Sequence, residues 1–228
     1  MNDILQEQQD YYDARAPEYD DWFYRHGRYD WGDEANRQWA DEAAEMRRHL
    51  LDRQAVDATL ELAAGTGIWT RELLRFSQTV TALDGSPEMI RIHRAKLQND
   101  RVINRQVDLF QWEPDGQFDF VAAFFWLSHV PTDRLVDFLG RIRRALRPEG
   151  VFFFGDSRLA RKSRAKDHEA PEVDTSTSQR KLEDGREYRI VKVFHRPADL
   201  TRIFAAAGLQ ADIRETSEYF LYGTGVHC

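Results

Sequence analysis

Short apolar runs alternate with helical patterns from about residue 57 onward. The runs that predict strands lie at residues 58–62, 79–84, 104–108, 118–125 and 150–156. The inner runs are almost continuously apolar, which is typical of parallel strands that are covered on both faces. Between them, the apolar residues Leu135, Phe138, Leu139, Ile142 and Leu146 recur at helical spacing. Alternating β and α units predict an α/β fold with a doubly wound, mostly parallel sheet.

The end of the chain has a different pattern. Residues 186–194 alternate polar and apolar side chains, as a half-covered strand does. A helical pattern at residues 200–207 follows and stops at Gly208, and a last apolar run covers residues 218–225. We expect these two runs to complete a seven-stranded, Rossmann-like sheet that ends in an antiparallel C-terminal hairpin.

Two segments lie outside this pattern. Residues 1–56 are expected to form a helical cap rich in aromatic side chains, and residues 57–228 to form the main domain. Within the main domain, residues 157–185 have almost no apolar periodicity. A long insertion of this kind is usually a lid or an irregular loop, so a lid-like segment is predicted there.

Composition narrows the classes of function. The net charge of −7 disfavours a protein that binds DNA or RNA over a broad basic surface. No apolar run is long enough to span a membrane, and the polar N-terminus lacks the pattern of a signal peptide. The single cysteine, Cys228, rules out a cysteine-rich metal site. We therefore expect a cytoplasmic protein, monomeric or homodimeric, without metal, nucleic acid or membrane as a partner.

The stretch "ELAAGTGIWT" at residues 61–70 carries the first candidate site. It lies between a predicted strand and a helical pattern, where glycines let a backbone approach a ligand closely. No Gly-Lys-Ser/Thr follows, so it is not a nucleotide triphosphate loop, and Thr70 stands where a dinucleotide loop has its third glycine. What remains is an acid followed by small residues at every second position: Glu61, Ala63, Gly65 and Gly67.

Acidic residues also end the next two predicted strands. Asp84 stands where a carboxylate can accept hydrogen bonds from both hydroxyls of a ribose. Asp108 can accept from the amino group of an adenine, with the backbone N–H of Leu109 beside it. Each acid alone could be an ordinary helix cap. Three strand ends with matching chemistry predict a site for an adenosine-containing cofactor.

Residues 58–156 resemble the core of class I methyltransferases that depend on S-adenosylmethionine (SAM). The resemblance is carried by "LELAAGTGIWT", "ALDGSPEMI", "VDLF", "FDFVAAFFWLSHVP" and "IRRALRPEGVFFFGD". Outside the core, "YYDARAPEYD" and "DGREYRIVKVFHRPADL" are similar to a bacterial subgroup of small-molecule methyltransferases that includes the phosphonate O-methyltransferase of dehydrophos biosynthesis. The resemblance implies SAM as cofactor and S-adenosylhomocysteine (SAH) as product. Ala63 departs from it, because the family more often has glycine there.

The resemblance also implies which residues contact SAM. They are Tyr12, Arg15, Tyr19, Glu61, Ala63, Gly65, Gly67, Trp69, Thr70, Asp84, Gly85, Ser86, Met89, Asp108, Leu109, Phe125 and Trp126. An N-terminal helix closes over the cofactor in resembling enzymes, which is why three residues of the cap are among them. Aromatic residues of the cap can equally serve only to hold it down.

Five residues are candidates for the acceptor site. His129 follows the fourth strand, where a neutral imidazole could accept a proton or simply bond to a backbone group. Arg180 and Lys192 match the anion-holding arginine and lysine of the phosphonate methyltransferase, although Lys192 could also point to solvent. His26 stands where that enzyme has a tyrosine, and Tyr29 is a further candidate in the cap.

Together these features predict methyl transfer from SAM to a small molecule, most simply at a hydroxyl or acid oxygen. An N-methyltransferase for a small amine and a SAM-binding module without turnover stay open as alternatives. A nucleic-acid methyltransferase is disfavoured, because its amino-methylating signature and its catalytic cysteine are both missing from the sequence.

Overall fold

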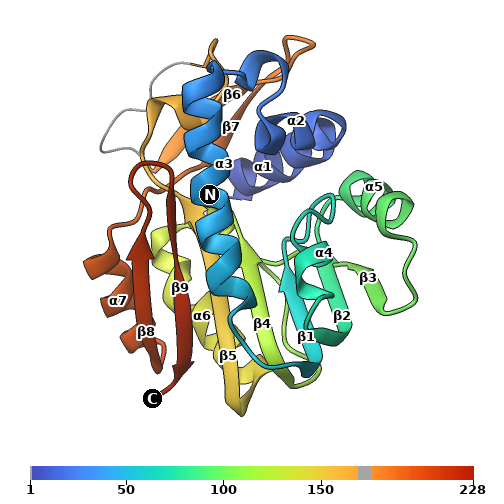
Figure 1. Cartoon of the computed structure of the whole chain (residues 1–228), viewed down its shortest axis with the longest axis vertical. Helices are drawn as coiled ribbons and strands as arrows, with labels where there is room; N and C mark the ends of the chain where they lie inside the picture. Colours follow the sequence, from blue (N-terminus) through green and yellow to red (C-terminus); the bar gives the residue numbers. More distant parts are fainter. Residues whose placement is uncertain (1, 169–175) are drawn as a thin grey trace.

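A seven-stranded sheet forms the centre of the computed structural model, which describes residues 2–168 and 176–228 (Figure 1). The strands, in sheet order, are β3 (Val102–Gln106), β2 (Ser77–Asp84), β1 (Val56–Leu62), β4 (Phe118–Phe124), β5 (Leu146–Ser157), β9 (Phe220–His227) and β8 (Leu209–Glu215). The first five run parallel, and β9 runs antiparallel to both of its neighbours. The predicted α/β fold with a mostly parallel sheet is confirmed.

Helices cover both faces of this sheet. On one face α3 (Asp33–Leu51) and α4 (Thr70–Leu73) contribute to a core that includes Met46, Leu50 and Phe153. On the other, α6 (Thr132–Ala145) and α7 (Pro197–Ala206) pack against residues such as Phe152. Helix α3 lies very close to β5, since a Cβ on Gly155 would come within 2.3 Å of the Met46 sulfur. Helix α5 (Pro87–Leu97) begins after Ser86, whose hydroxyl caps the helix by accepting a hydrogen bond from the Met89 N–H at 3.0 Å.

The C-terminal hairpin exists, but its strands differ from the predicted ones. It is formed by β8 and β9, whereas residues 187–191 form β7 (Glu187–Val191), which pairs with β6 (Thr177–Lys181) in a separate two-stranded sheet. The prediction missed β8 because most of its side chains are polar and exposed. The alternating pattern of β7 has another cause: Ile190 packs against Tyr11 of the N-terminal helix. Strand β6 lies in the predicted lid-like insertion, of which residues 169–175 fall outside the described residues.

The N-terminal segment lies over the carboxyl ends of the parallel strands, beside the β6–β7 hairpin (Figure 1). It consists of α1 (Asn2–Arg15), η1 (Ala16–Glu18), α2 (Tyr19–Tyr24) and η2 (Gly27–Tyr29). Two further short turns, η3 (Leu127–His129) and η4 (Arg161–Ser163), follow β4 and β5. The side chain of Gln8 on α1 bridges these parts, because it accepts from the Val191 N–H at 3.0 Å and donates to the His129 carbonyl at 3.2 Å. Helix α1 is thereby held over the region where ligands bind in such sheets.

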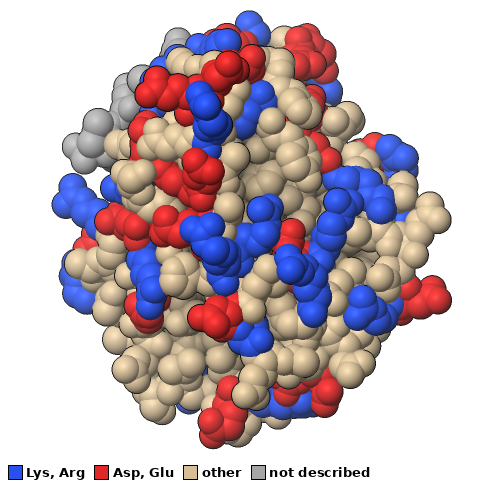
Figure 2. Space-filling model, viewed as in Figure 1, with Lys and Arg blue, Asp and Glu red and all other residues tan. Residues whose placement is uncertain are grey.

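Acidic and basic side chains are interspersed over the face shown in Figure 2. Among the described residues, no helix is both long and apolar enough to cross a bilayer.

Candidate functional site

The glycine loop after β1 needs backbone conformations that side chains disfavour. Ala63, Gly65 and Gly67 all have positive φ, of 54°, 54° and 86°. At Gly67 a Cβ would also lie 2.9 Å from the His93 ring, so glycine allows α5 to approach the loop. Alanine at position 63 adopts the left-handed conformation without glycine's freedom, a strain of about 1 kcal/mol that the packed loop sustains.

Asp84 ties this loop to the start of α5. Its Oδ2 accepts from the Gly65 N–H at 2.8 Å and its Oδ1 from the Ser86 N–H at 2.9 Å. Burial raises the pKa of Asp84, and the two backbone N–H groups partly counter that rise. Asp108 caps its own turn in a similar way, accepting from the Phe110 N–H at 2.9 Å and the Gln111 side chain at 2.8 Å. Both acids end parallel strands and lie beside one cavity.

This first cavity, of about 670 Å³, lies between the strand ends and α1. Of the residues expected to contact a cofactor, its wall contains Tyr12, Tyr19, Ala63, Gly65, Asp84, Gly85, Ser86, Met89, Asp108, Leu109, Phe125 and Trp126. The wall also contains Leu5, Gln8, Gln9, Phe110 and Phe124, which the sequence analysis did not single out. It combines a carboxylate for a ribose, a glycine loop and apolar side chains, and so suits an adenosine-containing ligand.

Five other expected cofactor residues lie outside this wall: Arg15, which is described below, and Glu61, Gly67, Trp69 and Thr70. Glu61 is buried beneath the loop, where it accepts a hydrogen bond from the Thr70 hydroxyl, and burial raises its pKa to about 8. Trp69 stacks on Phe124 with ring centroids 4.2 Å apart, and Gly67 faces α5. Trp69 and Thr70 begin α4, directly after the loop.

A second cavity, of about 570 Å³, adjoins the first. Its wall is formed by the cap, by η3 and by the insertion and hairpin: Tyr11, Tyr12, Arg15, Tyr19, Trp22, Tyr29, Phe125, His129, Ser157, Ser163, Arg164, His168, Arg180, Ile190, Lys192 and Phe194. Three residues, Tyr12, Tyr19 and Phe125, line both cavities. Phe125 has a φ of 57°, a strained conformation that proteins retain mainly at functional sites. The two cavities therefore meet at these rings.

Lys192 enters the second cavity from the chain after β7. It is buried, donates to the Ser128 hydroxyl at 2.7 Å and lies 3.6 Å from Asp156. Asp156 in turn accepts from the Ser128 N–H at 2.8 Å and its hydroxyl at 2.7 Å. Burial lowers the pKa of Lys192 to about 8, with Arg180 adding to the effect and Asp156 opposing it. The alternative that Lys192 points to solvent is wrong.

Two arginines share this cavity. Arg15, expected at the cofactor, lies instead in the second cavity, with its guanidinium 5.1 to 5.9 Å from the ring centroids of Tyr11, Tyr19, Trp22 and Tyr29. Its Nε is buried without a hydrogen-bond partner among the described residues. Burial lowers the pKa of Arg180, and Arg15 lowers it further. Among the described residues that line the cavity there is no aspartate or glutamate.

Both ring nitrogens of His129 are hydrogen-bonded to neighbouring groups. Its Nδ1 lies 2.7 Å from the Val191 carbonyl, so this nitrogen carries the proton. The Nε2 lone pair then accepts from the Tyr12 hydroxyl, 2.8 Å away. Burial, with Lys192 nearby, holds the pKa of His129 well below its ordinary value. The imidazole is therefore neutral, with both nitrogens in use.

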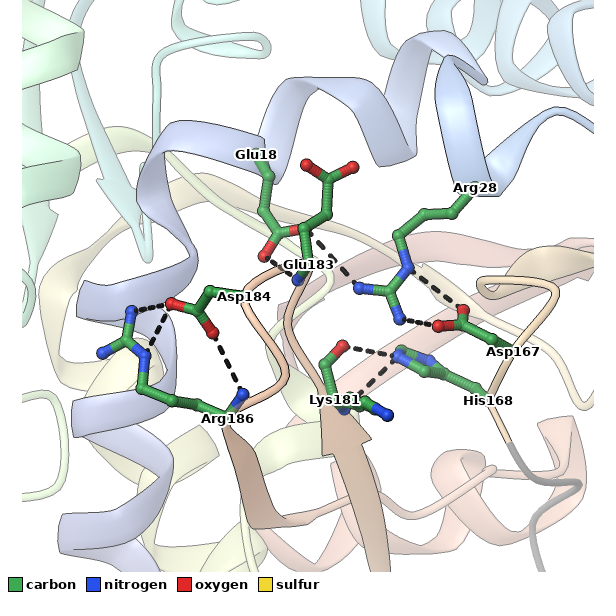
Figure 3. Close-up of polar contacts among 8 residues, drawn as sticks. All are labelled: Glu18, Arg28, Asp167, His168, Lys181, Glu183, Asp184 and Arg186. Carbon is green, nitrogen blue, oxygen red and sulfur yellow. Dashed lines mark hydrogen bonds and ion pairs between the residues drawn. The ribbon is translucent and has the colours of Figure 1, made fainter.

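The two other acceptor-site candidates in the cap lie in different environments. Tyr29 is buried in the wall of the second cavity, whereas His26 lies outside both cavities, with 67% of its side chain exposed and Asp21 3.3 Å away. Next to Tyr29, Arg28 donates to both oxygens of Asp167 at 3.1 and 2.6 Å. Figure 3 shows this pair joining the cap to the insertion, beside the contact between His168 and the hairpin.

Sequence reasoning missed Ser128, Asp156 and Gln8. Asp156 ends the predicted strand 150–156 just as Asp84 and Asp108 end theirs, so the same rule could have identified it. Ser128 stands next to His129 in a quoted motif. No local signal marks Gln8, because its role depends on two segments more than 100 residues away.

Known proteins are similar to this chain in sequence and in fold. The model of the methyltransferase domain family matches residues 59–150. Two solved structures of DhpI, described as a DhpI–SAH complex and a DhpI–SAM–HEP complex, are 38% and 40% identical to this chain. The first covers 100% of this chain and 98% of its own, the second 97% of each, and both have a TM-score of 0.79.

A more distant relative is the ubiquinone biosynthesis O-methyltransferase of Xanthomonas oryzae pv. oryzae, 29% identical over 135 residues. That match spans 52% of this chain and 55% of the relative, so this chain spans about half the length of the curated relatives that it matches. The DhpI matches extend over nearly the whole of both chains. With the glycine loop, the strand-end acids and the adjoining cavities in place, the chain belongs to the class I SAM-dependent methyltransferases.

Proposed function

We propose that this protein transfers the methyl group of SAM to an acid oxygen of a small molecule, such as a phosphonate. The observation that carries the proposal is the second cavity. Arg15, Arg180 and Lys192 line it next to the first cavity, and no acidic side chain lies among its described lining residues. Such a wall favours an anion that is already deprotonated at pH 7.

The first cavity has the residues that SAM requires. Asp84 would accept from the ribose hydroxyls, Asp108 and the Leu109 N–H would face the adenine, and the glycine loop would lie along the amino-acid portion. Bound SAM supplies an electrophilic methyl group on a sulfonium, so the protein has mainly to align the acceptor and exclude water. The rings of Tyr12, Tyr19 and Phe125, shared by both cavities, suit that role.

Loss of the Asp84 carboxylate tests the cofactor site. We expect Asp84→Ala to weaken SAM binding at least about tenfold, because it removes a charged acceptor and frees the backbone of the glycine loop. Titration calorimetry with SAM and SAH measures this. Asp57→Ala, an exposed acid on the same sheet, is the matched control and should bind normally. Equal affinity in Asp84→Ala and the control would remove Asp84 from the site.

No general base is needed for an ionised acid oxygen, and His129 is poorly suited to be one. Its proton lies toward the Val191 carbonyl and its lone pair toward Tyr12. We expect His129→Gln, which can keep both hydrogen bonds, to retain kcat for a phosphonate within about tenfold. Steady-state kinetics would check this, and a loss of a thousandfold with SAH affinity intact would indicate a base.

The pH dependence distinguishes two roles for Lys192. If its ammonium holds the acceptor, kcat/KM falls as the pH rises through about 8, where Lys192 loses its proton. Lys192→Arg stays charged throughout this range and should abolish that limb while keeping part of the activity. If neutral Lys192 were a base, kcat/KM would instead rise through the same pH. A pH–rate profile of both proteins decides between them.

Two alternatives fit less well. A small amine is a cation at pH 7 and would meet three like charges, Arg15, Arg180 and Lys192. A SAM-binding module without turnover needs no second cavity beside the first, lined by buried cations. The relatives agree with transfer to oxygen: the chain is 38–40% identical to DhpI, and it resembles the phosphonate O-methyltransferase subgroup in the motifs around Arg180 and Lys192.

A further inference from the structure

Gln8 is a buried side chain in the wall of the first cavity, and the proposed methyl transfer does not use it. It is 2% exposed, and both ends of its amide are hydrogen-bonded. Its Oε1 accepts from the Val191 N–H at 3.0 Å, and its Nε2 donates to the His129 carbonyl at 3.2 Å. An N–H only donates and a carbonyl only accepts, so these two partners fix the orientation of the amide.

A third hydrogen bond joins the two partners of Gln8 to each other. The His129 ring donates from Nδ1 to the Val191 carbonyl at 2.7 Å. Both backbone groups of Val191 are therefore bonded to side chains, one from α1 and one from η3. Gln8, His129 and Val191 form a closed ring of hydrogen bonds between α1, η3 and β7, and all three residues are buried. A buried network whose groups are all satisfied holds the segments that it joins in one arrangement.

The residues next to this ring place a cation in the second cavity. Ser128 precedes His129, and Lys192 follows Val191. The Lys192 ammonium donates to the Ser128 hydroxyl at 2.7 Å. A shift of Val191 away from His129 would therefore move the ammonium within the second cavity. The position of Lys192 depends in this way on Gln8, although the described lining of that cavity does not include Gln8.

Helix α1 has other contacts that hold it over the first cavity. Asp13, further along the helix, accepts from the Ser86 hydroxyl at 2.7 Å and from the Glu88 N–H at 3.1 Å. Both partners lie at the start of α5, on the side of the cofactor cavity. The helix therefore stays docked without the amide of Gln8, and loss of this amide should affect the acceptor more than the cofactor.

We infer that Gln8 is a positioning residue for the acceptor, because its hydrogen bonds to Val191 and His129 hold the Lys192 ammonium in place. The inference rests on the proposed function, in which Lys192 binds the acid of the acceptor. Gln8 acts through the backbone of Val191 and not by contact with the acceptor. The helix that covers the cofactor cavity thus also contributes to acceptor binding.

Replacing Gln8 by methionine tests this role. Methionine has a similar length and is tolerated in buried sites, but it lacks the amide donor and acceptor. We expect Gln8→Met to raise the KM for 3-hydroxypropylphosphonate about tenfold or more, because the Val191 N–H loses its partner and the strand end can shift. The Kd for SAH, measured by calorimetry, should stay within about threefold of the wild type.

KM does not depend on how much of the protein is folded, so reduced stability does not imitate the effect. Gln6→Met is the matched control. Gln6 is exposed on the same helix, where it donates to Asp10 at 2.9 Å, and its replacement should leave KM unchanged. An unchanged KM in Gln8→Met would overturn the inference. A loss of SAH affinity as large as the rise in KM would also overturn it, because Gln8 would then act at the cofactor.

Hydrogen exchange gives a second test that needs no acceptor. With SAH bound, the Val191 amide should exchange faster in Gln8→Met than in the wild type, because its hydrogen bond is missing. The glycine loop at residues 61–70 should keep its exchange rates. Equal exchange at Val191 in both proteins would overturn the inference. If the wild type methylates no phosphonate while SAH still binds, the proposed function fails, whereas faster exchange at Val191 would still assign Gln8 its positioning role.

Discussion

Replacing Lys192 by methionine is expected to lower kcat/KM for a phosphonate acceptor at least about 100-fold. The ammonium is buried in the second cavity, where a charged hydrogen bond to an anion is much stronger than in water. The ammonium donates to Ser128 and lies 3.6 Å from Asp156, which leaves it donors for a ligand. Methionine has a similar length and is tolerated in buried sites, so the change removes mainly the charge.

The fold should survive this substitution. Asp156, which would lose its partner, still accepts from the Ser128 N–H and hydroxyl and from the Ser157 N–H at 2.7 Å. SAH affinity and the thermal midpoint serve as controls, and both should stay close to wild type. Unchanged kcat/KM with intact SAH binding would show that the acceptor is not held as an anion at Lys192.

Replacing Glu42 by alanine is expected to destabilise the protein by about 3 kcal/mol. Glu42 lies on α3 and is buried against the turn between β8 and β9. Its carboxylate accepts from the hydroxyls of Thr216 and Ser217, from the Tyr219 N–H at 2.7 Å and from Gln38 at 3.0 Å. Alanine would remove the acceptor of the buried Tyr219 N–H and the shared partner that joins α3 to this turn. A decrease of about 6 to 12 °C in the midpoint of thermal unfolding corresponds to this loss.

The pH dependence of stability gives a second test at Glu42. Burial alone would raise its pKa, but the hydrogen bonds from Ser217 and Thr216 outweigh it, and the pKa lies below the ordinary 4.5. The charged form therefore stabilises the fold above pH 4.5, and this contribution is lost as the pH falls through the lower pKa of the folded state. The stability difference between wild type and Glu42→Gln should shrink in the same range. Asp41→Ala, an exposed neighbour, should change stability by less than about 0.5 kcal/mol.

The central sheet could be predicted because its signals are local. Runs such as residues 118–125 are continuously apolar, and the acids at Asp84 and Asp108 follow directly after strands. Strand β8 could not be found in this way, because an edge strand keeps polar side chains on exposed positions. Residues 186–194 had a true strand pattern, but periodicity does not say which partner covers a strand. In this case the partner is α1 and not the main sheet.

The residues of the second cavity were even harder to predict from local sequence patterns. Arg180 and Lys192 could be proposed only from the resemblance. Arg15 lies in the wall of the second cavity, and spacing within α1 does not reveal which cavity each residue faces. His168 lies in a segment without periodicity, and it is held in this wall by a contact with the Lys181 carbonyl of the hairpin. Such residues become visible only when the buried atoms of the folded chain are compared with their partners.

One measurement tests the central claim most directly. The protein is incubated with SAM and either 3-hydroxypropylphosphonate or 3-aminopropanol, and the methylated products are identified by mass spectrometry and phosphorus NMR. The two compounds share a hydroxyl and a three-carbon chain, and differ in offering an acid or an amine. Our account predicts a methyl ester on the phosphonate and no methylated amine. N-methylation of the amino alcohol, with no ester formed on the phosphonate, would contradict it.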